Sequence, residues 1–172
     1  MAFEWPWQYS FPPFFTLQPN LETRKKQLEA WCSLILTFCK QKKIFTFDVT
    51  EAQTSELFCN KSINRKLSND DLIFVLETLR KRGNLHWRDK KKTHFTIIWR
   101  TPDQWGTILY EWAQRTARLN TVCTIFELTN GVETTEEEFY GLDDSLILAS
   151  LKTLEASRKA EIIDRDGVKF FP

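Results

Sequence analysis

Apolar side chains recur every three or four positions across residues 21–42, as Trp31, Ile35 and Phe38 illustrate. This spacing predicts one long amphipathic helix over that segment. The elements predicted behind it are a strand over 44–47, a short helix over 50–58 and a loop over 60–66.

A further helix is predicted to begin after Ser68 and to continue until Gly83. Ser68 is a typical N-cap residue, and Asp71 three positions later gives an acidic variant of the capping box. Alternating apolar and polar residues follow in 85–87 and 95–99, which predicts a β-hairpin. The residues that connect its two strands are mostly basic.

The second half of the chain repeats this order. Its predicted elements are a helix from Pro102, a strand over 124–126, a short acidic helix over 135–139, a helix capped by Asp143, and a hairpin joining 161–163 to 168–171. Matching tetrapeptides support a repeat, since LETL at 76–79 lies 75 residues before LKTL at 151–154. A helix, a strand, two helices and a hairpin, in that order, are typical of the winged-helix form of the helix-turn-helix.

The fold class predicted from this order is α+β and mostly helical, with two tandem winged-helix domains preceded by an extended Pro/aromatic arm. We expect the arm to cover 1–20, the first winged-helix domain 21–100 and the second 101–172. Four prolines among the first twenty residues exclude a regular helix and favour an extended or polyproline II backbone.

Net charge differs between the two predicted domains, although the whole chain carries only +1. Residues 21–100 hold 17 Lys and Arg against 9 Asp and Glu, whereas 101–172 hold 7 against 13. A basic cluster comprises Arg80, Lys81, Arg82, Arg88, Lys90, Lys91 and Lys92. It is either a solvated run of charge or a surface for phosphates or acidic lipids. The acidic second domain suits a basic peptide or helix, unless it is simply a solvated face.

The sequence carries no motif for catalysis or for a cofactor. His86 and His94 lie on or beside the predicted hairpin without a companion nucleophile, so we expect neither an enzyme nor a cofactor. Cys32 and Cys39 lie seven apart on one helix face, which favours burial over metal binding. We expect no metal.

The first fifteen residues lack the basic region of a signal peptide and are interrupted by prolines. No apolar run reaches the roughly 18 residues that a membrane span requires. The four cysteines show neither the density nor the spacing of a disulfide scaffold. We therefore expect a protein of the reducing cytosol.

The segment FPPFF, residues 11–15, is the most specific feature of the chain. Its two prolines preset the backbone at low entropic cost, and the flanking aromatic rings can then anchor in a groove of a partner. Two alternatives stay open. The arm could fold back on its own domain, or it could be a ligand for a WW-type module, a class that usually has Tyr at the position of Phe15.

The arm also carries a family resemblance, together with shorter segments elsewhere. The segments are WPWQY at 5–9, FPPFFTLQPN at 11–20, QL at 27–28, AWCSL at 30–34, ELTNG at 127–131 and GVKFF at 167–171. Over nearly the whole chain the sequence resembles the family of small tandem winged-helix subunits of the ESCRT-II complex.

The resemblance implies a non-enzymatic cytoplasmic adaptor, recruited to endosomal membranes, that supports sorting of ubiquitinated cargo into multivesicular bodies. Two copies of the chain are expected to join one copy each of two larger winged-helix subunits through the arm. The residues that match this role are Trp5, Pro6, Trp7, Phe11, Pro12, Pro13, Phe14 and Phe15.

The same resemblance implies that the second domain binds the first helix of an ESCRT-III subunit. Candidates for that contact are Phe126, Glu127, Glu133, Asp164 and Asp166. A DNA-binding winged-helix regulator is the alternative function. Against it, acidic residues such as Asp70 and Asp143 stand where a recognition helix approaches phosphates, so no specific nucleic acid is expected as a partner.

Overall fold

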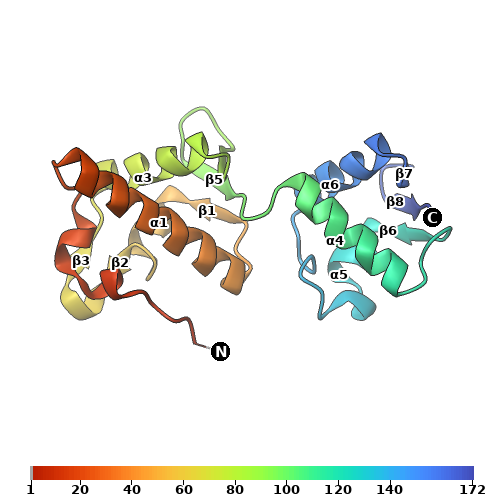
Figure 1. Ribbon diagram of the computed structural model, residues 1–172, viewed down its shortest axis with the longest axis horizontal. Coiled ribbons are helices and arrows are strands. Elements are labelled where there is room, and N and C mark those ends of the chain that lie inside the picture. Colours follow the sequence, from red (N-terminus) through yellow and green to blue (C-terminus); the bar gives the residue numbers. More distant parts are fainter. Residues whose placement is uncertain (1) are drawn as a thin grey trace. The chain divides into compact units, whose positions relative to one another are not determined.

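A computed structural model describes residues 2–172 (Figure 1). The chain falls into two units, Met1–Trp99 and Arg100–Pro172. This division lies one residue before the boundary expected from the sequence. Both units combine helices with small antiparallel sheets, which confirms the α+β class.

Unit 1 is built on the long predicted helix, α1 (Leu21–Lys42). Asn20 begins this helix because its side chain accepts hydrogen bonds from the backbone N–H groups of Glu22 and Thr23. The elements that follow are β1 (Thr46–Asp48), α2 (Val49–Thr54), β2 (Cys59–Asn60), η3 (Lys61–Ile63), β3 (Arg65–Lys66), α3 (Asn69–Lys81), β4 (Leu85–Trp87) and β5 (His94–Ile97). Strands β1, β5 and β4 form an antiparallel sheet in that order, and α1 packs against α3.

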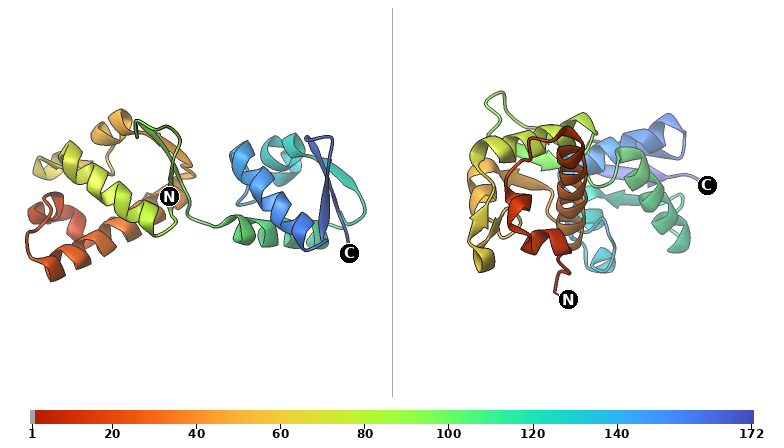
Figure 2. Two further views of the ribbon diagram at one scale, coloured as in Figure 1. Left: turned by 90° about the horizontal axis from the view of Figure 1, so that it is seen from above. Right: turned by 60° about the vertical axis from the view of Figure 1, so that its left-hand side comes forward.

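Unit 2 repeats the sequence of elements. They are α4 (Pro102–Arg115), β6 (Val122–Thr124), α5 (Ile125–Asn130), η4 (Val132–Thr134), α6 (Asp144–Ala156), β7 (Ala160–Ile163) and β8 (Gly167–Phe170). Its sheet has the equivalent order, β6-β8-β7. Helices α4 and α6 pack against each other (Figure 2). Their approach is close at Gly106 of α4, which faces Ser150 and Thr153 of α6.

Four local predictions were wrong, wholly or in part. The helix predicted over 50–58 ends at Thr54. The segment 60–66 is not a plain loop but contains the short β2–β3 hairpin. The predicted strand over 124–126 is instead the junction of β6 and α5, because the Thr124 side chain accepts from the Glu127 N–H and starts a helix there. The acidic segment 135–139 forms turns rather than a helix.

The arm is not extended, which corrects the predicted conformation. It forms two short 3-10 helices, η1 (Trp7–Ser10) and η2 (Pro12–Phe15), and packs against the core of unit 1. The physical reason is that proline fixes φ near −65°, a value shared by polyproline II and by the first turn of a helix. The two conformations therefore differ in ψ, which proline leaves free. The helical value is adopted here, and the resulting turns pair backbone groups: the Phe14 N–H donates to the Phe11 carbonyl at 2.9 Å.

No helix within residues 2–172 is both long enough and apolar enough to cross a membrane.

Candidate functional site

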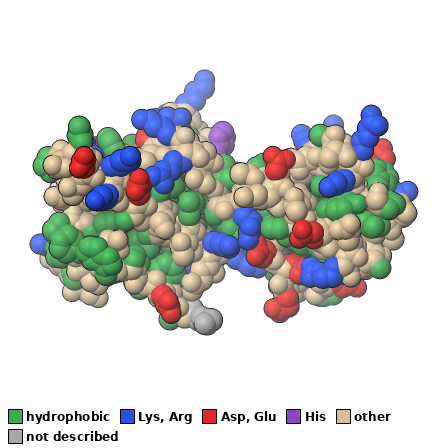
Figure 3. Space-filling view, in the orientation of Figure 1, with side chains coloured by type: hydrophobic (Ala, Val, Ile, Leu, Met, Phe, Trp, Pro, Cys, Tyr) green, Lys and Arg blue, Asp and Glu red, His purple; other side chains and the backbone are tan. Residues whose placement is uncertain are grey.

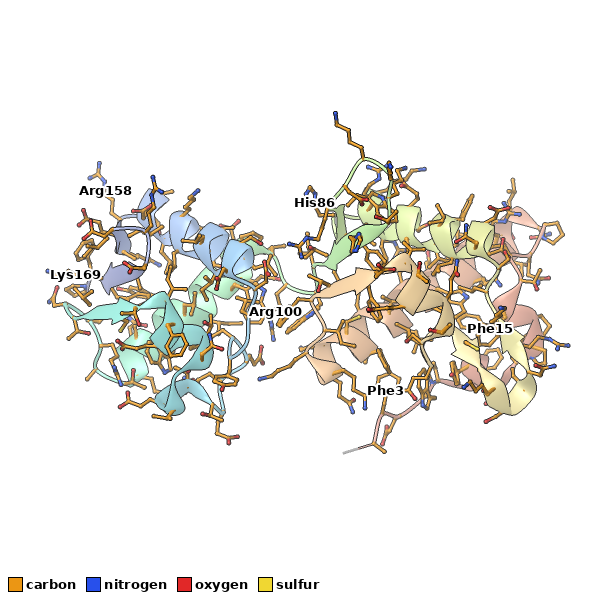
Figure 4. The ribbon with its side chains drawn as sticks, turned by 180° about the vertical axis from the view of Figure 1, so that it is seen from behind. Phe3, Phe15, His86, Arg100, Arg158 and Lys169 are labelled. Atoms are coloured by element: carbon orange, nitrogen blue, oxygen red, sulfur yellow. The ribbon has the colours of Figure 1, made fainter. Side chains whose placement is uncertain are left out.

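The C-terminal part of the arm is a buried anchor. Phe14 is 4% exposed and Phe15 is 2% exposed. The Phe14 ring stacks on Trp31 of α1 with centroids 4.3 Å apart, and the Phe15 ring meets the same indole edge-on at 5.4 Å. Figure 4 labels Phe15, which lies within unit 1 near β3. Of the alternatives that the sequence left open, the structure therefore has the arm folded back on its own domain.

Two side chains of α1 bind the backbone of the arm. Trp31 Nε1–H donates to the Phe14 carbonyl at 2.9 Å. The buried Gln27 amide donates to the same carbonyl at 3.0 Å and to the Thr16 carbonyl at 2.9 Å, while its Oε1 accepts from Gln18 N–H at 3.0 Å. These bonds satisfy backbone groups that burial removes from water, so the anchor is fixed by hydrogen bonds as well as by ring packing.

A second set of contacts holds the N-terminal part of the arm. Asn60 Nδ2 donates to the Tyr9 carbonyl at 2.7 Å, and the Tyr9 hydroxyl donates to the Glu56 carbonyl. Burial beside Glu56 raises the pKa of Tyr9 to about 12, so its hydroxyl stays protonated and can donate. The Trp5 ring stacks on the Tyr9 ring at 3.8 Å.

The tip of the arm is exposed. Trp7 is 70% exposed and Phe11 is 48% exposed, and their rings meet edge-on with centroids 5.6 Å apart. The pair borders a groove of about 490 Å³, whose lining includes Pro13, Lys26 and Ala30. Aromatic rings in water beside an apolar groove are typical of a protein-binding surface.

The eight predicted arm residues thus divide into three groups. Trp7, Phe11, Pro12 and Pro13 are exposed, whereas Trp5 and Pro6 are half-buried and Phe14 and Phe15 are core residues. In this conformation the last two do not reach a partner with their rings. Gln27 and Asn60 were missed by the sequence reasoning, because no local pattern marks a buried amide that binds a distant backbone.

In unit 2, α5 and the β7–β8 turn lie side by side, since Ile125 N–H donates to the Asp166 carbonyl at 2.8 Å. Phe126 is 69% exposed on α5, and Glu127 beside it is exposed. Glu133 of η4, which packs on α5, forms an ion pair with Arg118. Asp164 is exposed in the turn itself, so the candidates come from neighbouring elements.

Comparison with known proteins gives the family. The model of the ESCRT-II complex subunit family matches residues 8–143. Vacuolar protein-sorting-associated protein 25 of Danio rerio is 55% identical over 174 residues, which cover 99% of this chain and 100% of the relative. The Homo sapiens protein of that name is also 55% identical, over 99% of both chains. This chain belongs to the VPS25 family of ESCRT-II subunits.

Solved structures of the VPS25 family agree. The crystal structure of subunit VPS25 of the endosomal trafficking complex ESCRT-II is similar with a TM-score of 0.82 at 30% identity, covering 95% of this chain and 97% of that one. A chain in the crystal structure of the endosomal complex ESCRT-II (VPS22/VPS25/VPS36) is similar with a TM-score of 0.80 at 31% identity, covering 96% and 98%.

Two exposed apolar residues of this VPS25-family chain were missed by the sequence reasoning. Val122 on β6 is 58% exposed and Val132 on η4 is 91% exposed, and both elements adjoin α5. Val132 is a single valine in a polar stretch, and Val122 begins a mixed run, TVCTIF, so neither gives a signal that could have marked it as exposed. Within residues 2–172, no group of three or more His, Cys, Asp and Glu side chains could hold a metal ion.

Proposed function

We propose that this protein is a non-enzymatic subunit of ESCRT-II in which both units are winged-helix domains. The support for the domain type is the repeated order of helix, strand, two helices and hairpin with a three-stranded antiparallel sheet. The support for the complex is membership of the VPS25 family.

The arm binds the larger subunits. In the solved ESCRT-II complex the other subunits are VPS22 and VPS36. We take their counterparts as the partners here, one copy of each, with two copies of this chain. The observation that carries this proposal is the division of the arm: a buried anchor at Phe14 and Phe15 holds Trp7 and Phe11 in water beside a groove.

Preorganisation makes such a surface effective. The hydrogen bonds from Gln27 and Trp31 have already fixed the backbone of the arm, so little conformational entropy is lost on docking. Tryptophan is the residue type most enriched among the few that dominate binding energies. Trp7 and Phe11 are therefore the expected anchors, and Pro12 and Pro13 restrict the backbone next to them.

The test replaces the exposed pair and leaves the core intact. We expect Trp7→Ala with Phe11→Ala to weaken co-purification with the two larger subunits by about 30-fold or more, the loss for one strong anchor. A matched control is Phe74→Ala, which removes another exposed ring of unit 1 (44%) that does not line the groove. Normal complex formation by the double variant, or equal loss in the control, refutes the assignment.

The second unit binds a basic helix of an ESCRT-III subunit. Phe126 offers an exposed apolar anchor, with the exposed Glu127 next to it in α5 and with Asp164 and Asp166 in the neighbouring β7–β8 turn. Glu133 adds a carboxylate that is paired with Arg118. Such a combination fits an amphipathic helix whose polar face is basic.

A peptide of the first ESCRT-III helix tests this contact. We expect Phe126→Ala to weaken its binding by about tenfold or more and to leave assembly with the larger subunits unchanged. Glu111→Gln, an exposed acidic position on α4, is the matched control for general charge. If the control weakens binding as much as the Phe126 variant, the contact is nonspecific.

The cellular role follows from these two contacts. A cytoplasmic subunit that joins the ESCRT-II assembly and an ESCRT-III subunit connects successive steps in the sorting of ubiquitinated cargo into multivesicular bodies. Its recruitment to the endosomal membrane then depends on the complex. The similarity to the solved structure of subunit VPS25 of the endosomal trafficking complex ESCRT-II supports this role.

A further inference from the structure

One surface of unit 1 has no part in these contacts. It consists of the C-terminal end of α3 and the loop between β4 and β5, and we call it the basic wing patch. Its members, all exposed, are Arg80, Lys81, Arg82, Arg88, Lys90, Lys91 and Lys92. Figure 3 shows Lys and Arg side chains gathered over these elements.

Glu77 joins the two parts of the basic wing patch. This α3 carboxylate accepts hydrogen bonds from Arg80 Nε at 2.7 Å, from Lys92 Nζ at 2.6 Å and from Trp87 Nε1 at 2.8 Å. The hydrogen bonds from Lys92 and Arg80 lower its pKa to about 2, so it stays charged at neutral pH. The loop is thereby held against the end of the helix, and the patch is one preformed surface.

Most of the positive charge in the patch is uncompensated. Across residues 2–172, no ion pair is formed by Lys81, Arg82, Arg88, Lys90 or Lys91. Asp89 lies among them and accepts from the N–H groups of Thr93 and His94. With Glu77 it sets two carboxylates against the seven basic side chains, which leaves a net charge of +5. Like charges held this close repel one another, and an anionic ligand relieves that repulsion.

The position of the patch distinguishes a flat anionic surface from a nucleic-acid duplex. A winged helix that reads DNA inserts the N-terminal half of its recognition helix into the major groove. Here that end of α3 carries Asp70, which is exposed, and Asp71, whose carboxylate accepts from the Leu17 N–H of the arm. The basic side chains of the patch lie at the opposite end of α3 and in the loop. These two segments can contact a flat membrane surface while Asp70 and Asp71 stay away from its phosphates.

We propose that the basic wing patch binds anionic lipid headgroups at a membrane surface. Each Lys or Arg near such a surface strengthens binding by about fivefold, and the attraction decays within a Debye length of about 8 Å at physiological salt. The contact is peripheral, because the charges lie on an exposed loop and a helix end, and it is sensitive to ionic strength.

Vesicle flotation of the full chain tests this proposal. The vesicles are phosphatidylcholine alone or phosphatidylcholine with phosphatidylserine. The test variant is Arg88→Gln, Lys90→Gln and Lys91→Gln, none of which forms an ion pair. The control, Lys40→Gln, Lys61→Gln and Lys66→Gln, removes the same charge from exposed positions outside the patch. Circular dichroism verifies that both variants fold.

The expected result is salt-sensitive binding to the phosphatidylserine vesicles alone. Binding falls by roughly 100-fold in the patch variant, because three contributions of about fivefold are lost, and changes much less in the control. Equal loss in the two variants, or absence of binding by the wild type, overturns the proposal. Tighter binding to a duplex oligonucleotide than to the vesicles, lost in the patch variant, assigns the patch to nucleic acid instead.

Discussion

Replacement of Phe14 by alanine tests whether the arm is part of the folded core before any partner binds. The side chain is 4% exposed and its ring stacks on Trp31 at 4.3 Å. Deleting a fully buried phenylalanine side chain costs about 3–5 kcal/mol, since apolar contact is lost and a cavity remains. Phe11, three residues before Phe14 in the same arm, is 48% exposed, so its replacement costs only about 1 kcal/mol.

Thermal unfolding of the full chain measures the difference. At about 4–8 °C per kcal/mol for a domain of this size, Phe14→Ala lowers the Tm of unit 1 by more than 10 °C, and Phe11→Ala by less than about 8 °C. Leu109 is fully buried in unit 2, so Leu109→Ala shifts the unfolding transition of unit 2 and identifies it in the same experiment. If Phe14→Ala is no more destabilising than Phe11→Ala, the arm is not docked in the free chain.

Three further changes have defined outcomes. Gln27→Ala leaves the Gln18 N–H without its acceptor, Gln27 Oε1, and lowers the urea midpoint of unit 1, at a cost of about 1–3 kcal/mol. The pKa of Glu77 is lowered to about 2 in the folded chain, so its ion pairs stabilise unit 1 above pH 4.5 and this stabilisation is lost as the pH falls toward 2. In Glu77→Gln, the free energy of unfolding should therefore fall less steeply with decreasing pH over that range. Gly106→Ala should destabilise unit 2 by about 1–3 kcal/mol in thermal unfolding, since its Cβ would lie 2.5 Å from Thr153 Oγ1; an increase in stability contradicts the close helix packing.

The longer helices could be predicted because their signals are local. Apolar spacing gave α1 with its observed ends, and Ser68 caps α3 by accepting from the Asp71 N–H as expected. The Asp71 carboxylate does not complete the predicted capping box, however. It accepts instead from the Leu17 N–H, a partner 54 positions away that no helix-capping rule includes.

The short elements of unit 2 show where local signals fail. Ile125 and Phe126 follow a strand-like run, and an apolar pair of this length is compatible with a strand or with a helix. The N-cap at Thr124 decides for the helix. Phe126 is consequently placed on the surface of α5, a position that alternation along a strand does not predict.

The arm was predicted as a binding segment from its composition, but its conformation was not. Proline content excludes a long helix and leaves ψ free, so the 3-10 turns depend on Gln27, Trp31 and Asn60, which are distant in sequence. The division between buried Phe14 and exposed Trp7 arises from those contacts. Composition alone cannot say which aromatic rings of such a segment face a partner.

Reconstitution of the complex tests the central claim most directly. The full chain is mixed with the two larger subunits, and light scattering after gel filtration gives the mass of the assembly. The wild type should give a mass that accounts for two copies of this chain with one of each larger subunit. Trp7→Ala with Phe11→Ala should lower the unfolding temperature of the free chain far less than Phe14→Ala does, and yet leave the larger subunits unbound to this chain. A full-sized assembly from that variant contradicts the account.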